Sequence, residues 1–280
     1  MSELQALILG IVQGLTEPLP VSSSGHLILV PWIGDFTYLR DNESFNKTFD
    51  VALHIGTLAG VMVYFRKEVA MMIRGVFRLA IRRRAENADD RLALLMIIGT
   101  LPAVVVGGLG ENFIDSKLGE PWQIAILLAV FGLLLAWADR RPESRDLTSV
   151  GRGDAIKIGL AQALALMPGV SRSGITITAG RLLGLDRDAA ARFAFFLLVP
   201  STAGAIVFKG TKAAFEGLPP GVVGPMLVGI TASAISGYVA IAGLLRFVRT
   251  RTYDVFVVYR LLVAAIVLLL IATGVKEAEF

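Results

Sequence analysis

The stretch that organises this chain, residues 168–176, reads Pro-Gly-Val-Ser-Arg-Ser-Gly-Ile-Thr. It lies between two apolar segments, and its proline and glycine should end any helix that reaches it. Ser171 or Ser173 can then cap a new helix that runs to about Leu183, which leaves backbone N–H groups unpaired at its start. Those N–H groups, the hydroxyls and the guanidinium of Arg172 suit a phosphate group. An ordinary loop with a helix cap is the simpler interpretation of the same residues.

The composition is that of a membrane protein. Of the 280 residues, 55% are hydrophobic and only 18% are charged, whereas a soluble domain usually has about 25% charged residues. The absence of cysteine excludes disulfide and thiolate chemistry. Two histidines are too few for a metal site built from imidazoles. We therefore expect a membrane-embedded protein with no nucleic-acid partner.

About six apolar segments are long enough to span a membrane. They are residues 49–65, 92–109, 122–138, 189–208, 222–245 and 255–273. After the first of them, apolar residues recur at helical spacing from Val69 to Ile81, with arginines elsewhere on the helix. This pattern predicts an amphipathic helix on the membrane surface. Residues 111–120 are expected to form a short polar loop.

Two further apolar segments are interrupted by polar residues. In the first, residues 4–32, the run Glu-Pro-Leu-Pro at 17–20 separates two short helices, and the second, residues 154–183, contains the opening stretch. Short helices around a polar break are typical of a re-entrant hairpin, which is tolerated where protein or a wet cavity surrounds it. A pair of cytosolic or interfacial helices is the alternative.

The two broken segments look like copies of each other. A shift of 149 positions aligns them without a gap, and it places Gly10 on Gly159, Gln13 on Gln162, Ser22 on Ser171, Ser24 on Ser173 and Gly25 on Gly174. Chance identity in a sequence rich in small residues is the alternative. We predict one all-α membrane domain over residues 1–280, with repeats at about 1–139 and 153–275. Each repeat would be a re-entrant hairpin followed by three transmembrane helices.

An odd number of spans per repeat inverts the second copy relative to the first. The positive charges agree, because the basic segments 66–91, 140–152 and 246–251 then fall on one side. Both termini would lie outside, and the hairpin tips would meet near the middle of the membrane. Inverted repeats with broken helices that meet there are typical of transporters, and they would serve equally well in an enzyme that acts on a lipid headgroup.

The residues expected at that meeting point suit phosphoryl transfer. Gln13 and Glu17 share one helix face, and a carboxylate in an apolar segment is costly and usually functional. Glu17 could hold a divalent cation or act as a general base, and His26 could move protons or merely cap a helix. Arg172 would hold the phosphate, while Mg²⁺ or Ca²⁺ bound to Glu17 would bridge the oxygens of the phosphate. A structural ion pair of Glu17 with Arg172 is the alternative.

Two other groups of residues are open to interpretation. Asp50 and His54, four positions apart, could form a second ligand pair, although a packing or supporting role is preferred. Serine hydroxyls in membrane helices usually bond to backbone or to neighbouring helices, so the serines could be structural.

Three motifs then give a family resemblance. The Gln-x-x-x-Glu at 13–17, the Pro-Val-Ser-Ser-Ser-Gly-His at 20–26 and the Pro-Gly-Val-Ser-Arg-Ser-Gly at 168–174 resemble those of bacterial undecaprenyl pyrophosphate phosphatases, the bacitracin-resistance family. The resemblance covers essentially the whole chain. It implies hydrolysis of undecaprenyl diphosphate to undecaprenyl phosphate and phosphate in the bacterial inner membrane. That reaction recycles the lipid carrier for peptidoglycan synthesis and confers bacitracin resistance.

The resemblance also implies roles for individual residues. The catalytic residues would be Glu17, His26 and Ser23. The pyrophosphate-binding residues would be Arg172, Ser171, Ser173, Thr176, Ser22 and Gln13. The family is similar in needing Mg²⁺ or Ca²⁺. Because Gln13 stands where the motif also allows Glu, the metal would rest on Glu17 and on oxygens of the substrate. A Ser23 nucleophile activated by His26 and direct attack by water both fit the sequence.

A second class of function is compatible with the inverted repeat, namely a transporter or flippase for an anionic polyprenyl lipid. The enzyme must release phosphate, whereas the transporter must move its substrate unchanged. For the enzyme, the distribution of positive charge predicts a site that opens to the outer, periplasmic side. The sequence leaves a homodimer open.

Overall fold

The computed structural model describes the backbone of residues 1–216 and 221–278, and the side chains of those ranges except at 43–44, 111–116 and 212–216. The first half contains α1 (Glu3–Thr16), α2 (Ser23–Gly34), α3 (Thr37–Asp41), α4 (Glu43–Tyr64), α5 (Arg66–Arg82), α6 (Ala88–Lys117) and α7 (Pro121–Asp139). The second half contains η1 (Leu147–Ser149), α8 (Arg152–Ala163), η2 (Leu164–Leu166), α9 (Arg172–Leu182), α10 (Arg187–Glu216), α11 (Val223–Phe247) and α12 (Asp254–Ala272). Helices and no strands occur in these described ranges, so the predicted all-α fold is confirmed.

The multi-pass membrane protein that the composition predicts is also confirmed. Among the described residues, the helices α6, α7, α10, α11 and α12 are long and apolar enough to cross a membrane. The first predicted span is α4, which passes that test only together with α5, and the chain bends by 95° between these two helices. The predicted amphipathic helix is therefore α5.

The predicted polar loop at 111–120 is wrong over most of its length, because α6 continues to Lys117. No proline interrupts this stretch. The helix ends only before Gly119, whose φ of 128° is unsuited to other residues, and Pro121 then starts α7.

Each hairpin packs through glycine on a helix that is distant in the sequence. In the pair of α1 with α11, a Cβ added to Gly10 would come within 2.5 Å of the Gly229 carbonyl oxygen. In the pair of α8 with α6, a Cβ added to Gly159 would come within 2.4 Å of the Gly99 carbonyl oxygen. Small residues allow this close approach of helix backbones in membranes. The division into two repeats and the bounds of each remain a prediction.

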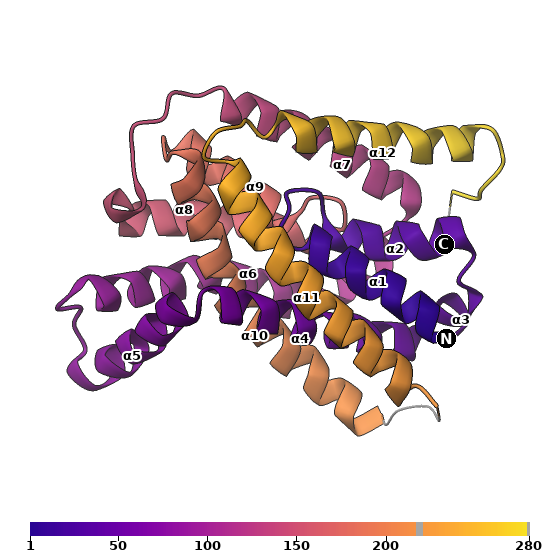
Figure 1. The fold of residues 1–280 in the computed structure, drawn as a ribbon, viewed down its shortest axis with the longest axis horizontal. Coiled ribbons are helices and arrows are strands. Elements are labelled where there is room, and N and C mark those ends of the chain that lie inside the picture. The colour runs from indigo at the N-terminus through magenta and orange to yellow at the C-terminus, as the bar shows by residue number, and fades with distance from the viewer. Residues whose placement is uncertain (217–220, 279–280) are drawn as a thin grey trace.

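The connections of the two hairpins lie close together in the middle of the molecule (Figure 1). Ser22 caps α2 and Ser171 caps α9, and their φ angles are 75° and 76°. Residues other than glycine rarely adopt this region. Each cap hydroxyl accepts a hydrogen bond from the N–H three residues further on, in Gly25 or Gly174. As a result, Ser23 and Arg172 are the first residues of α2 and α9 and occupy matching places at the two tips.

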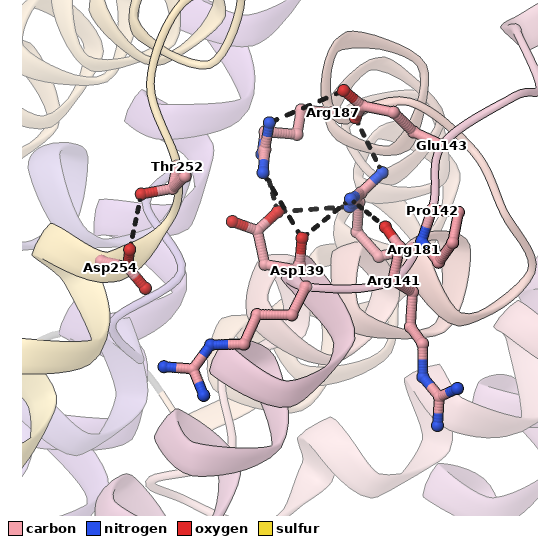
Figure 2. Close-up of a pocket in the computed structure, with 9 residues that line it drawn as sticks. Asp139, Arg141, Pro142, Glu143, Arg181, Arg187, Thr252 and Asp254 are labelled. Carbon is pink, nitrogen blue, oxygen red and sulfur yellow. Dashed lines mark hydrogen bonds and ion pairs between the residues drawn. The ribbon is translucent and has the colours of Figure 1, made fainter.

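A cluster of ion pairs surrounds the end of α7 (Figure 2). Asp139 Oδ1 accepts hydrogen bonds from Arg181 Nε at 3.2 Å and from Arg187 Nε at 2.7 Å. Arg181 is buried and also donates to Glu143 Oε2 at 3.0 Å. These residues line a pocket of about 330 Å³. The cluster joins the end of α7 to α9 and α10, and every charge named here has an opposite partner, as burial requires.

Candidate active site

Direct hydrogen bonds join the two hairpin tips. The Ser22 hydroxyl accepts from the Gly169 N–H at 3.0 Å, and the Ser173 hydroxyl donates to the Leu19 carbonyl at 2.8 Å. The first bond satisfies the Gly169 N–H, which the broken helix leaves unpaired, whereas the Leu19 carbonyl also accepts from the Val21 N–H at 2.8 Å. The structure therefore brings the Glu17-to-His26 motif and the Pro168-to-Thr176 motif into one place, which the sequence predicts.

Glu17 is the carboxylate of this junction. It follows the last residue of α1, and its side chain is only 3% exposed. Its Oε2 accepts a hydrogen bond from Ser23 Oγ and another from Gln13 Nε2, the latter at 3.2 Å. A buried carboxylate needs such donors or an opposite charge, because burial otherwise disfavours the ionised form.

Arg172 supplies the positive charge from the other tip. Its Nη2 lies 3.9 Å from Glu17 Oε1, which is an ion pair beyond hydrogen-bond distance. Its Nη1 donates to Ser201 Oγ at 3.1 Å and to Thr202 Oγ1 at 2.6 Å, both on α10. These two anchors fix the guanidinium, while a quarter of the side chain stays exposed. The guanidinium is thus held in a fixed orientation toward Glu17 and is still accessible to an anionic ligand.

His54 on α4 reaches the same carboxylate. Its Nε2 lies 3.6 Å from Glu17 Oε2, and its Nδ1 is 2.7 Å from the Asp50 carbonyl oxygen. A carbonyl only accepts, so Nδ1 carries a proton and donates it. Nε2 is then the nitrogen that faces Glu17. The spacing of His54 to Asp50 was the only signal of this residue in the sequence, and it favoured a packing or supporting role.

Within the described part of the chain, two buried oxygen atoms at the junction have no hydrogen-bond partner. They are Gln13 Oε1 and Glu17 Oε1, on side chains one helical turn apart. Unpaired buried oxygens are unfavourable, and hard oxygen ligands are those that Mg²⁺ and Ca²⁺ prefer. The pair therefore fits part of a divalent-cation site. The described residues contain no group of three acidic, histidine or cysteine side chains that could hold a metal ion, so further oxygens must come from a bound ligand.

His26 is not brought to this carboxylate. Its Nδ1 lies 2.7 Å from the Ser22 carbonyl oxygen, and its Nε2 lies 2.7 Å from the Tyr259 hydroxyl. The two rings are also stacked, with centroids 5.6 Å apart. His26 thus connects α2 with α12, and no hydrogen bond or ion pair joins its side chain to Glu17, Ser23 or Arg172 in the described part of the chain.

The remaining residues predicted to bind pyrophosphate are buried at the tips. Ser171 caps α9, and the Thr176 hydroxyl donates to the Arg172 carbonyl at 2.7 Å. Ser22 and Ser173 make the bonds between the tips described above. In this structure these hydroxyls support the backbone that carries Ser23 and Arg172.

Comparisons with known proteins agree with the family indicated by the motifs. The chain matches the family model described as bacitracin resistance protein BacA over residues 6–266. It is 47% identical to the undecaprenyl-diphosphatase of Geobacter sulfurreducens, over 96% of this chain and 98% of that protein. It is 45% identical to the undecaprenyl-diphosphatase of Geotalea daltonii, over 98% of this chain and all of that protein. For the protein of the same name from Pelobacter propionicus the identity is 44%, over 99% of this chain and all of the relative.

Proposed function

Since the chain belongs to the BacA family of bacitracin resistance proteins, we propose that it hydrolyses undecaprenyl diphosphate to undecaprenyl phosphate and inorganic phosphate. The observation that carries the proposal is the junction of the two tips. There the buried carboxylate of Glu17, the Ser23 hydroxyl that donates a hydrogen bond to it and the anchored guanidinium of Arg172 meet between apolar helices. A substrate with a phosphate headgroup and a long prenyl chain fits such a site, because the membrane itself delivers it.

Ser23 is the proposed nucleophile and Glu17 the proposed general base. The Ser23 hydroxyl already donates its hydrogen bond to Glu17 Oε2, so the carboxylate can take that proton as Ser23 Oγ attacks the terminal phosphorus. The bond from this phosphorus to the bridging oxygen breaks, and undecaprenyl phosphate leaves. Water then attacks the phosphoserine as the bond from phosphorus to Oγ breaks, Glu17 returns its proton to Ser23 Oγ, and the protons of the water leave with inorganic phosphate.

Arg172 binds the pyrophosphate and neutralises the charge that builds up on the transferred phosphoryl group. Its anchors on α10 hold the guanidinium before substrate arrives. His54 supports the base, because its Nε2 faces the oxygen that receives the Ser23 proton. The sequence predicted a catalytic role for His26. We propose instead that it positions α2 through its hydrogen bond to Tyr259 on α12.

A divalent cation, Mg²⁺ or Ca²⁺, completes the proposed site. Gln13 Oε1 and Glu17 Oε1 would hold it, together with oxygens of the diphosphate. When bound, it would withdraw charge from the phosphate oxygens. Glu17 would then use its two oxygens for two purposes, with Oε1 toward the cation and Oε2 toward Ser23.

The protein would act in the bacterial inner membrane, with the site open to the periplasmic side. Most of the basic residues outside the spans lie in three segments. These are the helix α5, the connector between α7 and α8, and the turn between α11 and α12. They lie toward one end of the long axis, and both termini lie toward the other (Figure 1). By the excess of positive charge on cytoplasmic segments, the basic end faces the cytoplasm. Recycling of the lipid carrier for peptidoglycan synthesis would follow from the reaction.

The proposed activity is tested with the full chain in detergent and in sealed vesicles. We expect release of phosphate from undecaprenyl diphosphate in both preparations. Movement of intact undecaprenyl diphosphate across the vesicle membrane, with no phosphate released under Mg²⁺ or Ca²⁺, would contradict the proposal. That result would favour the flippase, an alternative to which the comparisons give no support.

A further inference from the structure

Arg260 is a buried cation inside an apolar helix. It lies in α12, and none of its surface is exposed. The hydrogen bonds of its side chain all go to backbone carbonyls, and no carboxylate pairs with it among the described residues. A charge buried without a counterion is unfavourable, so this placement requires a compensating set of acceptors.

The acceptors come from both hairpin tips and from α7. Nη1 donates to Pro20 O and to Val170 O, each at 3.2 Å. Nη2 donates to Gly169 O at 2.9 Å and to Val170 O at 3.2 Å. The remaining bonds join Nε to Leu128 O at 2.9 Å and Nη2 to Leu127 O at 3.3 Å. One guanidinium therefore joins the first tip, the second tip and α7.

The chemistry of the guanidinium explains why arginine fits this place. Broken helices leave carbonyls unpaired, and in a membrane nearly every such group must find an internal donor. Arginine offers five N–H groups in a rigid planar fork, whereas lysine offers three on a single atom. The fit is tight, because a Cβ added to Gly174 would come within 3.1 Å of Nη1.

The bonded carbonyls lie next to the reacting groups in the sequence. Pro20 precedes Ser23 by three residues, and Val170 precedes Arg172 by two. Since the same Nη1 holds the carbonyls of Pro20 and Val170, its position limits how far the tips can separate. Resting on the proposed phosphatase function, we propose that Arg260 is a positioning residue that holds the two tips at the spacing that Ser23 and Arg172 require for attack on the diphosphate.

Tyr259, its neighbour on α12, strengthens this connection. The tyrosine hydroxyl bonds to His26 of α2 at 2.7 Å, and the two rings stack. α12 thus touches the first hairpin twice, at the tip through Arg260 and at the first turn of α2 through Tyr259. Small displacements of reacting groups reduce catalytic rates strongly, so the loss of this support should affect turnover more than substrate binding.

The test compares the two fully buried arginines, Arg260 and Arg181, in the full chain with Mg²⁺. Arg260→Ala should lower kcat at least 100-fold with less than a threefold change in KM. Guanidinium ion at millimolar concentration should restore part of kcat by filling the vacated space. Hydrogen exchange should accelerate in peptides that cover residues 18–24 and 168–174.

Arg181→Ala is the matched control, because it removes an equally buried guanidinium from the Asp139 cluster and not from the tips. Its folded fraction should keep its kcat, and its faster exchange should appear near residue 139.

If Arg260→Ala does not fold, Arg260→Lys takes its place, and a lowered kcat with an intact melting transition is expected. An active wild type whose Arg260→Lys and foldable Arg260→Ala variants keep kcat within threefold would overturn the positioning role. It would equally be overturned if the activity lost by Arg260→Lys only matched its unfolded fraction, with no acceleration of exchange localised to the tips. A wild type that releases no phosphate would instead refute the proposed function, and the exchange measurement would still report whether Arg260 holds the tips.

Discussion

The Ser23 hydroxyl donates a hydrogen bond to Oε2 of Glu17, across the break in the first hairpin. The same oxygen accepts from Gln13 and faces His54. In contrast, Oε1 of Glu17 has no hydrogen bond from any described residue and lies 3.9 Å from Arg172 Nη2. One carboxylate therefore presents two different environments. This asymmetry separates the proposed proton acceptor from the proposed cation ligand.

The first prediction concerns the covalent intermediate. When wild type turns over substrate labelled in its terminal phosphate, an acid quench should trap the label on Ser23. Ser23→Ala should lower kcat by at least about 10²-fold, since the nucleophile is lost. Ser24→Ala, which removes the neighbouring hydroxyl, should keep most of the activity. If Ser23→Ala retains more than a tenth of wild-type kcat and no label is trapped, water attacks directly.

The second prediction concerns the guanidinium at the second tip. Arg172→Lys keeps the positive charge but removes the planar guanidinium. That group donates hydrogen bonds to Ser201 and Thr202 and at the same time faces the site. We expect kcat/KM to fall about 10²-fold, as for the loss of one aimed donor. Steady-state kinetics in detergent measures this. Ser201→Ala should have a smaller effect, because the Thr202 anchor remains. Equal kcat/KM for Arg172→Lys and wild type would show that only the charge matters.

The third prediction separates the two histidines. His54→Gln should lower kcat about 10-fold to 100-fold, as for residues that support a reacting group, with little change in melting temperature. His26→Gln should lower kcat less than His54→Gln does, and it should also lower the stability by about 1 kcal/mol, the value of a typical hydrogen bond, because it breaks the contact with Tyr259. Thermal melts and kcat are measured on the same preparations. A larger fall in kcat for His26→Gln at equal folded content would restore its assignment to catalysis.

The fourth prediction concerns the cation. Chelation should abolish phosphate release by wild type, and Mg²⁺ or Ca²⁺ should restore it. Gln13→Glu adds a second carboxylate next to Glu17 and removes the donor at 3.2 Å. In chelator the melting temperature of this variant should fall through like-charge repulsion. Added cation should raise it again and should activate at a lower concentration than in wild type. A melting temperature that does not respond to cation would place the metal elsewhere.

Much of the fold could be predicted from local sequence. Hydropathy predicted the long helices. The Pro-Gly and Glu-Pro-Leu-Pro breaks predicted both tips, because turn residues affect the backbone over only a few positions. The structure also decides between two candidate caps in favour of Ser171. The prediction of a polar loop at 111–120 was wrong because polarity alone does not end a helix. Gly119 and Pro121 are the residues that end it.

The contacts between distant helices could not be predicted in the same way. His54 meets Glu17 because α4 and α1 contact each other and both pack on α11, and no local pattern records that packing. Arg260 does leave a signal in the sequence, since a lone charge in the apolar run 255–273 is costly and usually functional. The identity of its five carbonyl partners still required the three-dimensional arrangement of both tips.

The most direct test of the central claim, that the junction of the two tips hydrolyses a lipid diphosphate, is phosphate release by three proteins side by side. Wild type, Glu17→Gln and Arg172→Ala are compared in detergent with Mg²⁺, with Ca²⁺ and after chelation. We predict cation-dependent release by wild type, and release reduced by about 10²-fold or more in both variants while they remain folded. Release that survives both substitutions would show that the reaction takes place elsewhere in the protein.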